Sequence, residues 1–327
     1  MKLSDILIKK LPYWILQISV IVVLAFFLTA SRTKKPVPTQ TPIRPIQATT
    51  TEAIPQTPTT SQQTSTPKPV TFSTLRLEAK AAIVYDVNSA KILYAKNINE
   101  HLPIASITKV MTAFTASTYL PADTIITISQ EEALVESSAG IVAGERWPIK
   151  ALTAFTLTSS SNGGAKALAR ATEETTFVDF ISQMNGLAKE LGLSETLFRN
   201  PTGLDIYDGQ MSGSYSTALD IAKLFTYISE NDSALMSGTN RGSLAVYSAD
   251  NVRHQAINTN LLVAKVPNIE MSKTGFTDLA GGNVAIVFEP KLGRKVAVVI
   301  LGSSSQGRFT DLEKLVKTTI QSLSKGS

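Results

Sequence analysis

Residues 102–112 read Leu-Pro-Ile-Ala-Ser-Ile-Thr-Lys-Val-Met-Thr and lead into an apolar run that ends near Leu120. The run is apolar on almost all sides, which is typical of a helix buried in a core. Ser106 and Lys109 stand three residues apart at its start, so they share one helix face. Free backbone N–H groups at a helix N-terminus can hold a developing oxyanion. The pattern predicts a buried helix that opens on a Ser-Lys pair.

This Ser-Lys pair has two interpretations. Burial and a nearby cation both lower the pKa of a lysine, and a neutral lysine can take the proton of a serine nucleophile. Alternatively, Ser106 caps the helix and Lys109 extends to solvent. The spacing does not decide, because lysine also follows Ser31, Ser65 and Ser322 by three residues.

Two further motifs favour the catalytic interpretation. Ser160-Ser161-Asn162 lies between two helical patterns, and Lys273-Thr274-Gly275 lies in a predicted strand near the C-terminus. The first is weak alone, because Ser229-Glu230-Asn231 repeats its pattern. The conjunction of all three motifs in this order is far rarer than any one of them.

The remaining patterns predict strands at both ends of the folded body and helices between them. That order is typical of an α+β domain with an antiparallel sheet and helices packed on it. The predicted strands are 81–86, 91–95, 243–248, 269–276, 282–288 and 295–301, and the predicted helices are 106–120, 149–160, 163–173, 176–191, 216–230 and 311–323.

With these motifs the chain resembles the penicillin-binding D-alanyl-D-alanine carboxypeptidases, which are low-molecular-mass serine peptidases that trim peptidoglycan. The resemblance covers roughly 78–325, and residues 137–140, 200–205, 215–218 and 273–278 support it. It implies a β-lactamase/DD-peptidase-like α+β fold. This fold has an antiparallel five-stranded sheet with flanking helices and an all-helical subdomain.

The resemblance also implies catalytic roles. Ser106 would attack the carbonyl between two D-alanines, Lys109 would be the base, and Ser160 would relay a proton to the leaving amine. Water would then release the acyl-enzyme. No metal and no organic cofactor is implied. The implied partners are peptidoglycan stem peptides ending in D-Ala-D-Ala and β-lactam antibiotics as covalent inhibitors.

The implied substrate-binding residues are Asn162, Lys273, Thr274, Gly275 and Phe276. Asn162 would hold the substrate amide and orient Lys109. Lys273 would pair with the terminal carboxylate and keep Lys109 neutral by repulsion, and Thr274 would add a hydroxyl. The backbone N–H groups of Ser106 and Phe276 would form the oxyanion hole.

Composition excludes several other chemistries. The 327 residues include no cysteine, which excludes disulfides, a thiol nucleophile and thiolate metal ligands. The two histidines, His101 and His254, are too few for a His-Glu-x-x-His zinc motif, and both are predicted to be structural. Residues 1–75 hold eight of the 31 basic and two of the 26 acidic residues. The remainder, with 23 basic and 24 acidic residues, has no basic footprint for nucleic acid.

The N-terminal segments predict a membrane tether. Residues 1–12 are expected to be cytoplasmic, 13–30 to form a transmembrane signal-anchor helix, 31–75 to be a disordered Thr/Pro-rich linker and 76–327 to be the catalytic domain. A cleaved signal peptide is the alternative, although Leu28-Thr29-Ala30 is a poor cleavage site. Flanking lysines and arginines do not settle the orientation. The substrate places the catalytic domain on the outer side of the cytoplasmic membrane.

The chain departs from the family pattern at two places. Gly163 stands where the family often has Asp, and we expect it to loosen the helix start because glycine lacks a capping oxygen. After Gly275 there is room to finish the sheet and one helix. We therefore expect neither the β-rich domain nor the C-terminal anchor of many relatives, and 13–30 to replace that anchor.

Three alternatives to a carboxypeptidase remain open. A DD-endopeptidase would use the same acyl donor. A class A β-lactamase would need a Glu-x-x-Leu-Asn loop, which the segment Glu195–Asn200 does not match, and Asp rather than Ser161 in the second motif. A catalytically inactive wall-binding scaffold would not need the intact set of catalytic side chains.

Overall fold

The computed structural model describes residues 71–324. The predicted cytoplasmic N-terminus 1–12, the membrane anchor 13–30 and nearly all of the linker 31–75 lie outside the described residues. Within 71–324, no helix combines the length and apolar character needed to cross a membrane. Phe72 and Leu75, at the end of the predicted linker, pack against the folded body.

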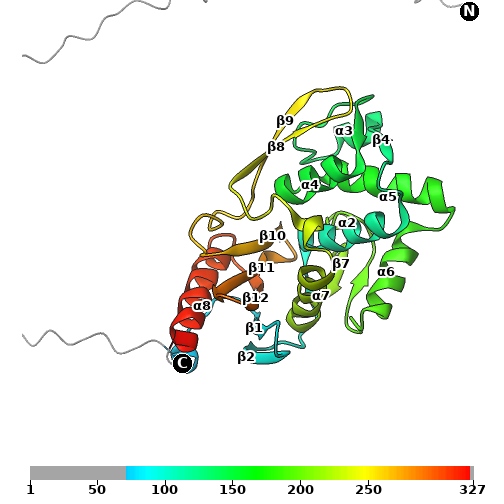
Figure 1. The fold of residues 1–327 in the computed structure, drawn as a ribbon. Helices are drawn as coiled ribbons and strands as arrows, with labels where there is room; N and C mark the ends of the chain where they lie inside the picture. The colour runs from blue at the N-terminus through cyan, green and yellow to red at the C-terminus, as the bar shows by residue number, and fades with distance from the viewer. Residues whose placement is uncertain (1–70, 325–327) are drawn as a thin grey trace, which may run out of the picture. The chain divides into compact units, whose positions relative to one another are not determined.

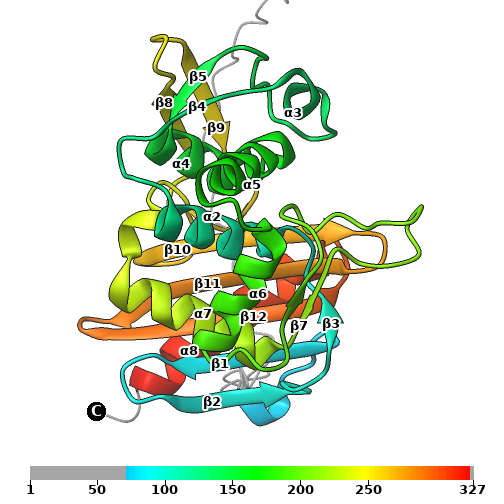
Figure 2. The same cartoon turned by 90° about the vertical axis from the view of Figure 1, so that its right-hand side faces the viewer.

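A five-stranded antiparallel sheet forms the base of the fold, in the order β10-β11-β12-β1-β2 (Figure 2). The first two and last three long strands of the chain therefore meet in one sheet, with β1 against β12. The predicted fold class is confirmed. The strands are β1 (Ala81–Asp86), β2 (Lys91–Lys96), β10 (Ile269–Thr277), β11 (Gly281–Lys291) and β12 (Arg294–Ser303).

Helices cover both faces of the sheet, and the apolar side chains of β1 point alternately to one face and the other. Ala81 and Ile83 face the core beneath α7 (Ala218–Asn231), whereas Ala82 and Val84 face the core beneath α8 (Gly307–Ser324). A strand buried on both faces reads as a continuous apolar run, as this one does.

The helical subdomain lies beyond the β10 edge of the sheet (Figure 1). Its core gathers around Trp147 and Phe155. Its helices are α2 (Thr108–Tyr119), α3 (Gln130–Leu134), α4 (Ile149–Ser159) and α5 (Asn162–Thr176), whereas α6 (Phe180–Glu190) buries its apolar side chains in the core that includes Ala81 and Ile83 of the sheet.

Short strands and turns complete the described chain. The small sheets pair β4 (Ile125–Thr127) with β5 (Arg146–Pro148), β8 (Ser243–Tyr247) with β9 (Arg253–Ile257), and β3 (Leu102–Pro103) and β6 (Leu197–Phe198) with β7 (Ser214–Ser216). The 3₁₀ turns are η1 (Phe72–Thr74), η2 (Ala105–Ile107) and η3 (Ser233–Met236).

Two predicted helix starts differ from the structure by four residues, and the other helix boundaries differ by three residues or fewer. The helix expected over 176–191 begins at Phe180, because Phe177 adopts a left-handed φ of 58° and Asp179 caps the next helix. The last helix begins at Gly307 rather than at residue 311. Near this boundary, the exposed Glu173 and Glu174 bind the Phe180 N–H and Arg170 respectively.

The expectation that Gly163 loosens the start of α5 was wrong. Ser161 caps this helix by accepting a hydrogen bond from the Gly164 N–H at 3.0 Å. A Cβ at Gly163 would lie 2.2 Å from the backbone oxygen of Glu132. Glycine is therefore required at this position so that α3 and α5 can pack closely.

Replacing Gly163 by alanine is expected to lower the free energy of unfolding by about 1–3 kcal/mol, because the added methyl group must push two backbones apart. Chemical denaturation measures this change. Gly186→Ala is the matched control, because that glycine lies within α6 and its Cβ would meet nothing within 4 Å. Equal stability of both variants would contradict the packing argument.

Candidate active site

Ser106 lies in η2, where the start of α2 meets strand β10. The approach is close: a Cβ at Gly275 would lie 2.9 Å from the Ser106 backbone nitrogen and 2.7 Å from the Ile104 oxygen. Only glycine permits this contact. Ala105, just before the serine, has a φ of 48°, a strained conformation of the kind that concentrates at functional sites.

Ser106 and Lys109 form a hydrogen-bonded pair, with 2.7 Å between Oγ and Nζ. Ser106 is partly exposed, whereas Lys109 is 0% exposed. Lys109 also donates to the backbone oxygen of Thr202 at 2.8 Å. The predicted alternative, in which Lys109 extends to solvent, was wrong.

The surroundings of Lys109 favour its neutral form. Burial holds the pKa of this amine well below its ordinary value, and the nearby charge of Lys273 lowers it further. Among residues 71–324, no carboxylate is paired with this lysine. The neutral amine can therefore accept a proton from the Ser106 hydroxyl.

Ser160 and Lys273 form a second pair, with 2.8 Å between Oγ and Nζ. Ser160 ends α4 with a left-handed φ of 61°, and Lys273 also donates to the Thr274 oxygen at 2.9 Å. Burial and the charge of Arg308 lower the pKa of Lys273 to about 7. This lysine therefore changes its charge near neutral pH.

Arg308 is a residue that the sequence interpretation missed. Its Nη1 donates to the Gly275 oxygen at 2.7 Å, and its guanidinium lies 5.9 Å from the Phe276 ring centroid. Its Nε is buried and has no hydrogen-bond partner among residues 71–324, and burial lowers the pKa of the guanidinium. No spacing rule connects it to the Lys273 motif, because the two meet only through the fold.

Asn162 is positioned differently from the prediction. It was expected to orient Lys109, but its Nδ2 donates to the backbone oxygen of Glu136 at 2.8 Å, and Lys109 binds Thr202 instead. Its Oδ1 is buried and has no hydrogen-bond partner in the part of the chain that the structure describes. Because the Glu136 carbonyl can only accept, this contact fixes the amide orientation and leaves Oδ1 as a free acceptor.

The rest of the third motif is also held in place. The Thr274 hydroxyl is hydrogen-bonded to that of Thr259 at 2.6 Å, a partner that the sequence did not predict. Thr277 donates to Asp205 at 3.0 Å. Phe276, which follows the motif in strand β10, is 48% exposed. The motif thus presents a lysine and a hydroxyl at one end and an open apolar side chain at the other.

The histidines are engaged elsewhere in the fold. His101 pairs with Glu195 at the surface. His254 pairs with Glu145 at 2.7 Å beside the ring of Trp147. Glu195 begins the segment that was compared with the Glu-x-x-Leu-Asn loop of a β-lactamase. Its carboxylate is bound to a histidine outside the Ser106 site.

Comparison with known proteins gives a consistent result. A family model described as D-alanyl-D-alanine carboxypeptidase matches residues 63–305. The carboxypeptidase DacF of Bacillus subtilis is 30% identical over 257 residues, and the D-alanyl-D-alanine endopeptidase of Escherichia coli is 30% identical over 251. Penicillin-binding protein D2 of Listeria monocytogenes, solved in its ampicillin-bound form, matches with a TM-score of 0.64 and 29% identity, over 75% of this chain and 98% of that one.

The extent of these matches differs between relatives. The alignments with these two curated relatives both cover 75% of this chain. They span 62% of the Bacillus subtilis carboxypeptidase and 78% of the Escherichia coli endopeptidase. The shared part contains all three motifs of the site, since the family match runs from residue 63 to residue 305.

Proposed function

Because this chain belongs to the D-alanyl-D-alanine carboxypeptidase family, we propose that it removes the terminal D-alanine from peptidoglycan stem peptides through an acyl-enzyme on Ser106. One observation carries the proposal. The Ser106 hydroxyl lies 2.7 Å from the amine of a buried lysine whose pKa is strongly lowered. A serine with a neutral lysine beside it is an activated nucleophile.

Acylation follows from this arrangement. Lys109 takes the hydroxyl proton as Ser106 attacks the carbonyl between the two D-alanines. The backbone N–H groups of Ser106 and Phe276 hold the negative oxygen. Lys109 gives this proton up through Ser160 to the leaving amine, so that it is neutral again when free D-alanine departs. Water then attacks the ester, gives up its proton to the same base and restores the Ser106 hydroxyl.

The charge near the third motif supports a substrate with a free carboxylate. Lys273 and the Thr274 hydroxyl would bind that carboxylate, and Arg308 adds a second cation with an unpartnered Nε. Asn162 Oδ1 would accept the N–H of the substrate amide. A bound anion would also offset the cost of burying two cations.

Covalent labelling with a fluorescent penicillin tests this function. Wild type is expected to carry a stable label, and Ser106→Ala to carry none, because the mutant lacks the attacking oxygen. Ser117→Ala is the control: it lies in α2, and within 71–324 its hydroxyl binds only the Phe114 oxygen. Rapid release of the label would indicate a β-lactamase instead. A folded wild type that takes no label would favour the inactive scaffold.

An endopeptidase is the second candidate, since relatives with that name are 28–31% identical to this chain. It would cleave a D-alanyl bond whose product amine belongs to a second stem peptide. Mass spectrometry of digests of pentapeptide and of cross-linked dimer separates the two activities. Faster cleavage of the dimer would reverse the preference proposed here.

The apolar run 13–30 supports a membrane tether as part of the same proposal. It would hold the catalytic domain on the outer side of the cytoplasmic membrane, where peptidoglycan lies. Fractionation of cells that express the full chain tests the tether. Recovery of the full chain in the soluble fraction would contradict it, whereas a chain lacking 1–30 serves as the soluble reference.

A further inference from the structure

The loop Val135–Gly140 is the support of the second motif. Three consecutive carbonyl oxygens of this loop accept hydrogen bonds from Ser161 and Asn162. Glu136 accepts from Asn162 Nδ2 at 2.8 Å, Ser137 from the Asn162 N–H at 3.0 Å, and Ser138 from Ser161 Oγ at 2.7 Å. Every described partner of the Asn162 side chain is therefore in this loop.

The loop is poorly suited to hold its own shape. Ser137 and Ala139 have left-handed φ values of 57° and 61°, which cost free energy in residues that carry a side chain. The preceding helix α3 has only five residues, too short to be stable by itself. Its position must be determined by contacts with the rest of the subdomain.

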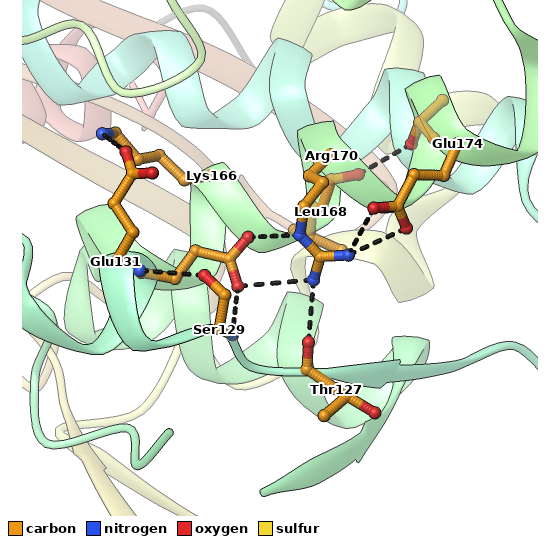
Figure 3. Close-up of polar contacts among 9 residues, drawn as sticks. Thr127, Ser129, Glu131, Lys166, Leu168, Arg170 and Glu174 are labelled. Atoms are coloured by element: carbon orange, nitrogen blue, oxygen red, sulfur yellow. Dashed lines mark hydrogen bonds and ion pairs between the residues drawn. The ribbon is translucent and has the colours of Figure 1, made fainter. Parts of the chain in front are cut away.

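Arg170 supplies those contacts (Figure 3). It projects from α5, the same helix that begins with Asn162, and donates to Glu132 Oε1 at 2.7 Å and to the Thr127 oxygen at 2.7 Å. Glu174, one turn further along, binds Arg170 Nη1 at 2.8 Å. The guanidinium thus ties α3 and β4 to α5 through three hydrogen bonds, two to Glu132 and one to Thr127.

Glu132 connects this cation to the loop. Only 4% of the residue is exposed, and its Oε2 accepts the Ser129 N–H at 2.7 Å, which closes the first turn of α3. Its backbone oxygen accepts the Ser138 hydroxyl at 3.0 Å. The hydrogen bond from Arg170 to Glu132 is also the largest cause of the raised pKa of Arg170, so this cation stays charged.

We infer that Glu132 and Arg170 are positioning residues that set the orientation of the Asn162 amide through the loop Val135–Gly140. The inference rests on the proposed function, because Asn162 acts on substrate only there. Helix α5 is attached to this region twice: Asn162 binds the loop itself, and Arg170, two turns later, binds Glu132 in the helix α3 that precedes the loop. When the contact between Arg170 and Glu132 is weakened, the Glu136 carbonyl can move. The Asn162 Nδ2 then loses its hydrogen bond to this carbonyl, and Oδ1 is no longer held in position to accept from the substrate.

The test measures the rate of Ser106 acylation by fluorescent penicillin in Glu132→Gln. This variant keeps the shape of the side chain but removes the charge that Arg170 binds. We expect a loss of about 10- to 100-fold, because small displacements of positioning groups cost that much. Glu131→Gln is the matched control: its side chain is 84% exposed, and Lys166, at 3.4 Å, is its only ion-pair partner in the described part of the chain. It should acylate like wild type.

A double-mutant cycle separates positioning from a general loss of structure. In the Asn162→Ala background there is no amide to orient, so Glu132→Gln should slow acylation less than twofold further. A folded Glu132→Gln that acylates like wild type would overturn the inference. So would an equal loss in both backgrounds. Failure of wild type to take any label would instead reject the proposed function, and the inference with it.

Arg170→Lys gives an independent measurement if Glu132→Gln does not fold. Lysine keeps the charge but cannot bind Glu132, Glu174 and the Thr127 carbonyl at once. We expect the same loss and the same dependence on Asn162. Thermal unfolding of each variant confirms that folded protein is compared, and full acylation by folded Arg170→Lys would also overturn the inference.

Discussion

Lys109→Met is expected to reduce the rate of Ser106 acylation about 1,000-fold, within the range that a positioned general base contributes. Methionine fills nearly the same apolar space, so the fold should persist. The Ser106 hydroxyl then has no base at 2.7 Å, and its proton must pass to water. A time course of labelling by fluorescent penicillin measures the change.

The control for this variant is Lys166→Met, which removes a partly exposed lysine from α5 that pairs only with Glu131 among the described residues. It should label at the wild-type rate. If folded Lys109→Met also labelled at that rate, Lys109 would not be the base. The pair formed by Ser160 and Lys273 would then be the next candidate to activate Ser106.

The second prediction concerns pH. For a substrate with a free carboxylate, kcat/KM should fall about tenfold for each pH unit above 7, because Lys273 loses its proton with a pKa of about 7 in the free enzyme. On the acid side, kcat/KM should fall as Lys109 gains the proton that prevents it from acting as base. The profile is therefore bell-shaped.

The basic limb has a signature that distinguishes it from denaturation. A bound carboxylate favours the charged form of Lys273, so the limb in kcat should lie at higher pH than the limb in kcat/KM. In Lys273→Arg the limb should disappear from the neutral range, since arginine stays protonated. A basic limb near pH 7 that persists in Lys273→Arg would assign it to another group.

The fold was predictable because apolar patterns determine it. The runs at 81–86 and 295–301 are continuous because both faces of the sheet are covered, and they lie within two neighbouring strands. Helix ends were less predictable. A single left-handed residue at Phe177 and a cap at Asp179 moved one boundary.

The site was predictable only where its residues are close in sequence or belong to a motif. Ser106 and Lys109 are one helical turn apart, and their contact follows from helix geometry. The contacts of Lys109 with Thr202, of Thr274 with Thr259 and of Gly275 with Arg308 join distant segments. Backbone oxygens such as that of Thr202 carry no side-chain signal at all, so only the tertiary structure reveals them.

The two buried lysines also have a thermodynamic consequence. Among residues 71–324, neither is paired with a carboxylate, and Lys273 titrates at about 7 in the folded chain. Between that pH and the ordinary lysine value, the unfolded chain binds the proton more tightly, so stability rises with pH across this window. At pH values below this window, the buried charge of Lys273 lowers the free energy of unfolding by on the order of a few kcal/mol. The two lysines thus serve the reaction although they lower the stability of the fold. A descendant protein that no longer needed the reaction would become more stable by losing these amines.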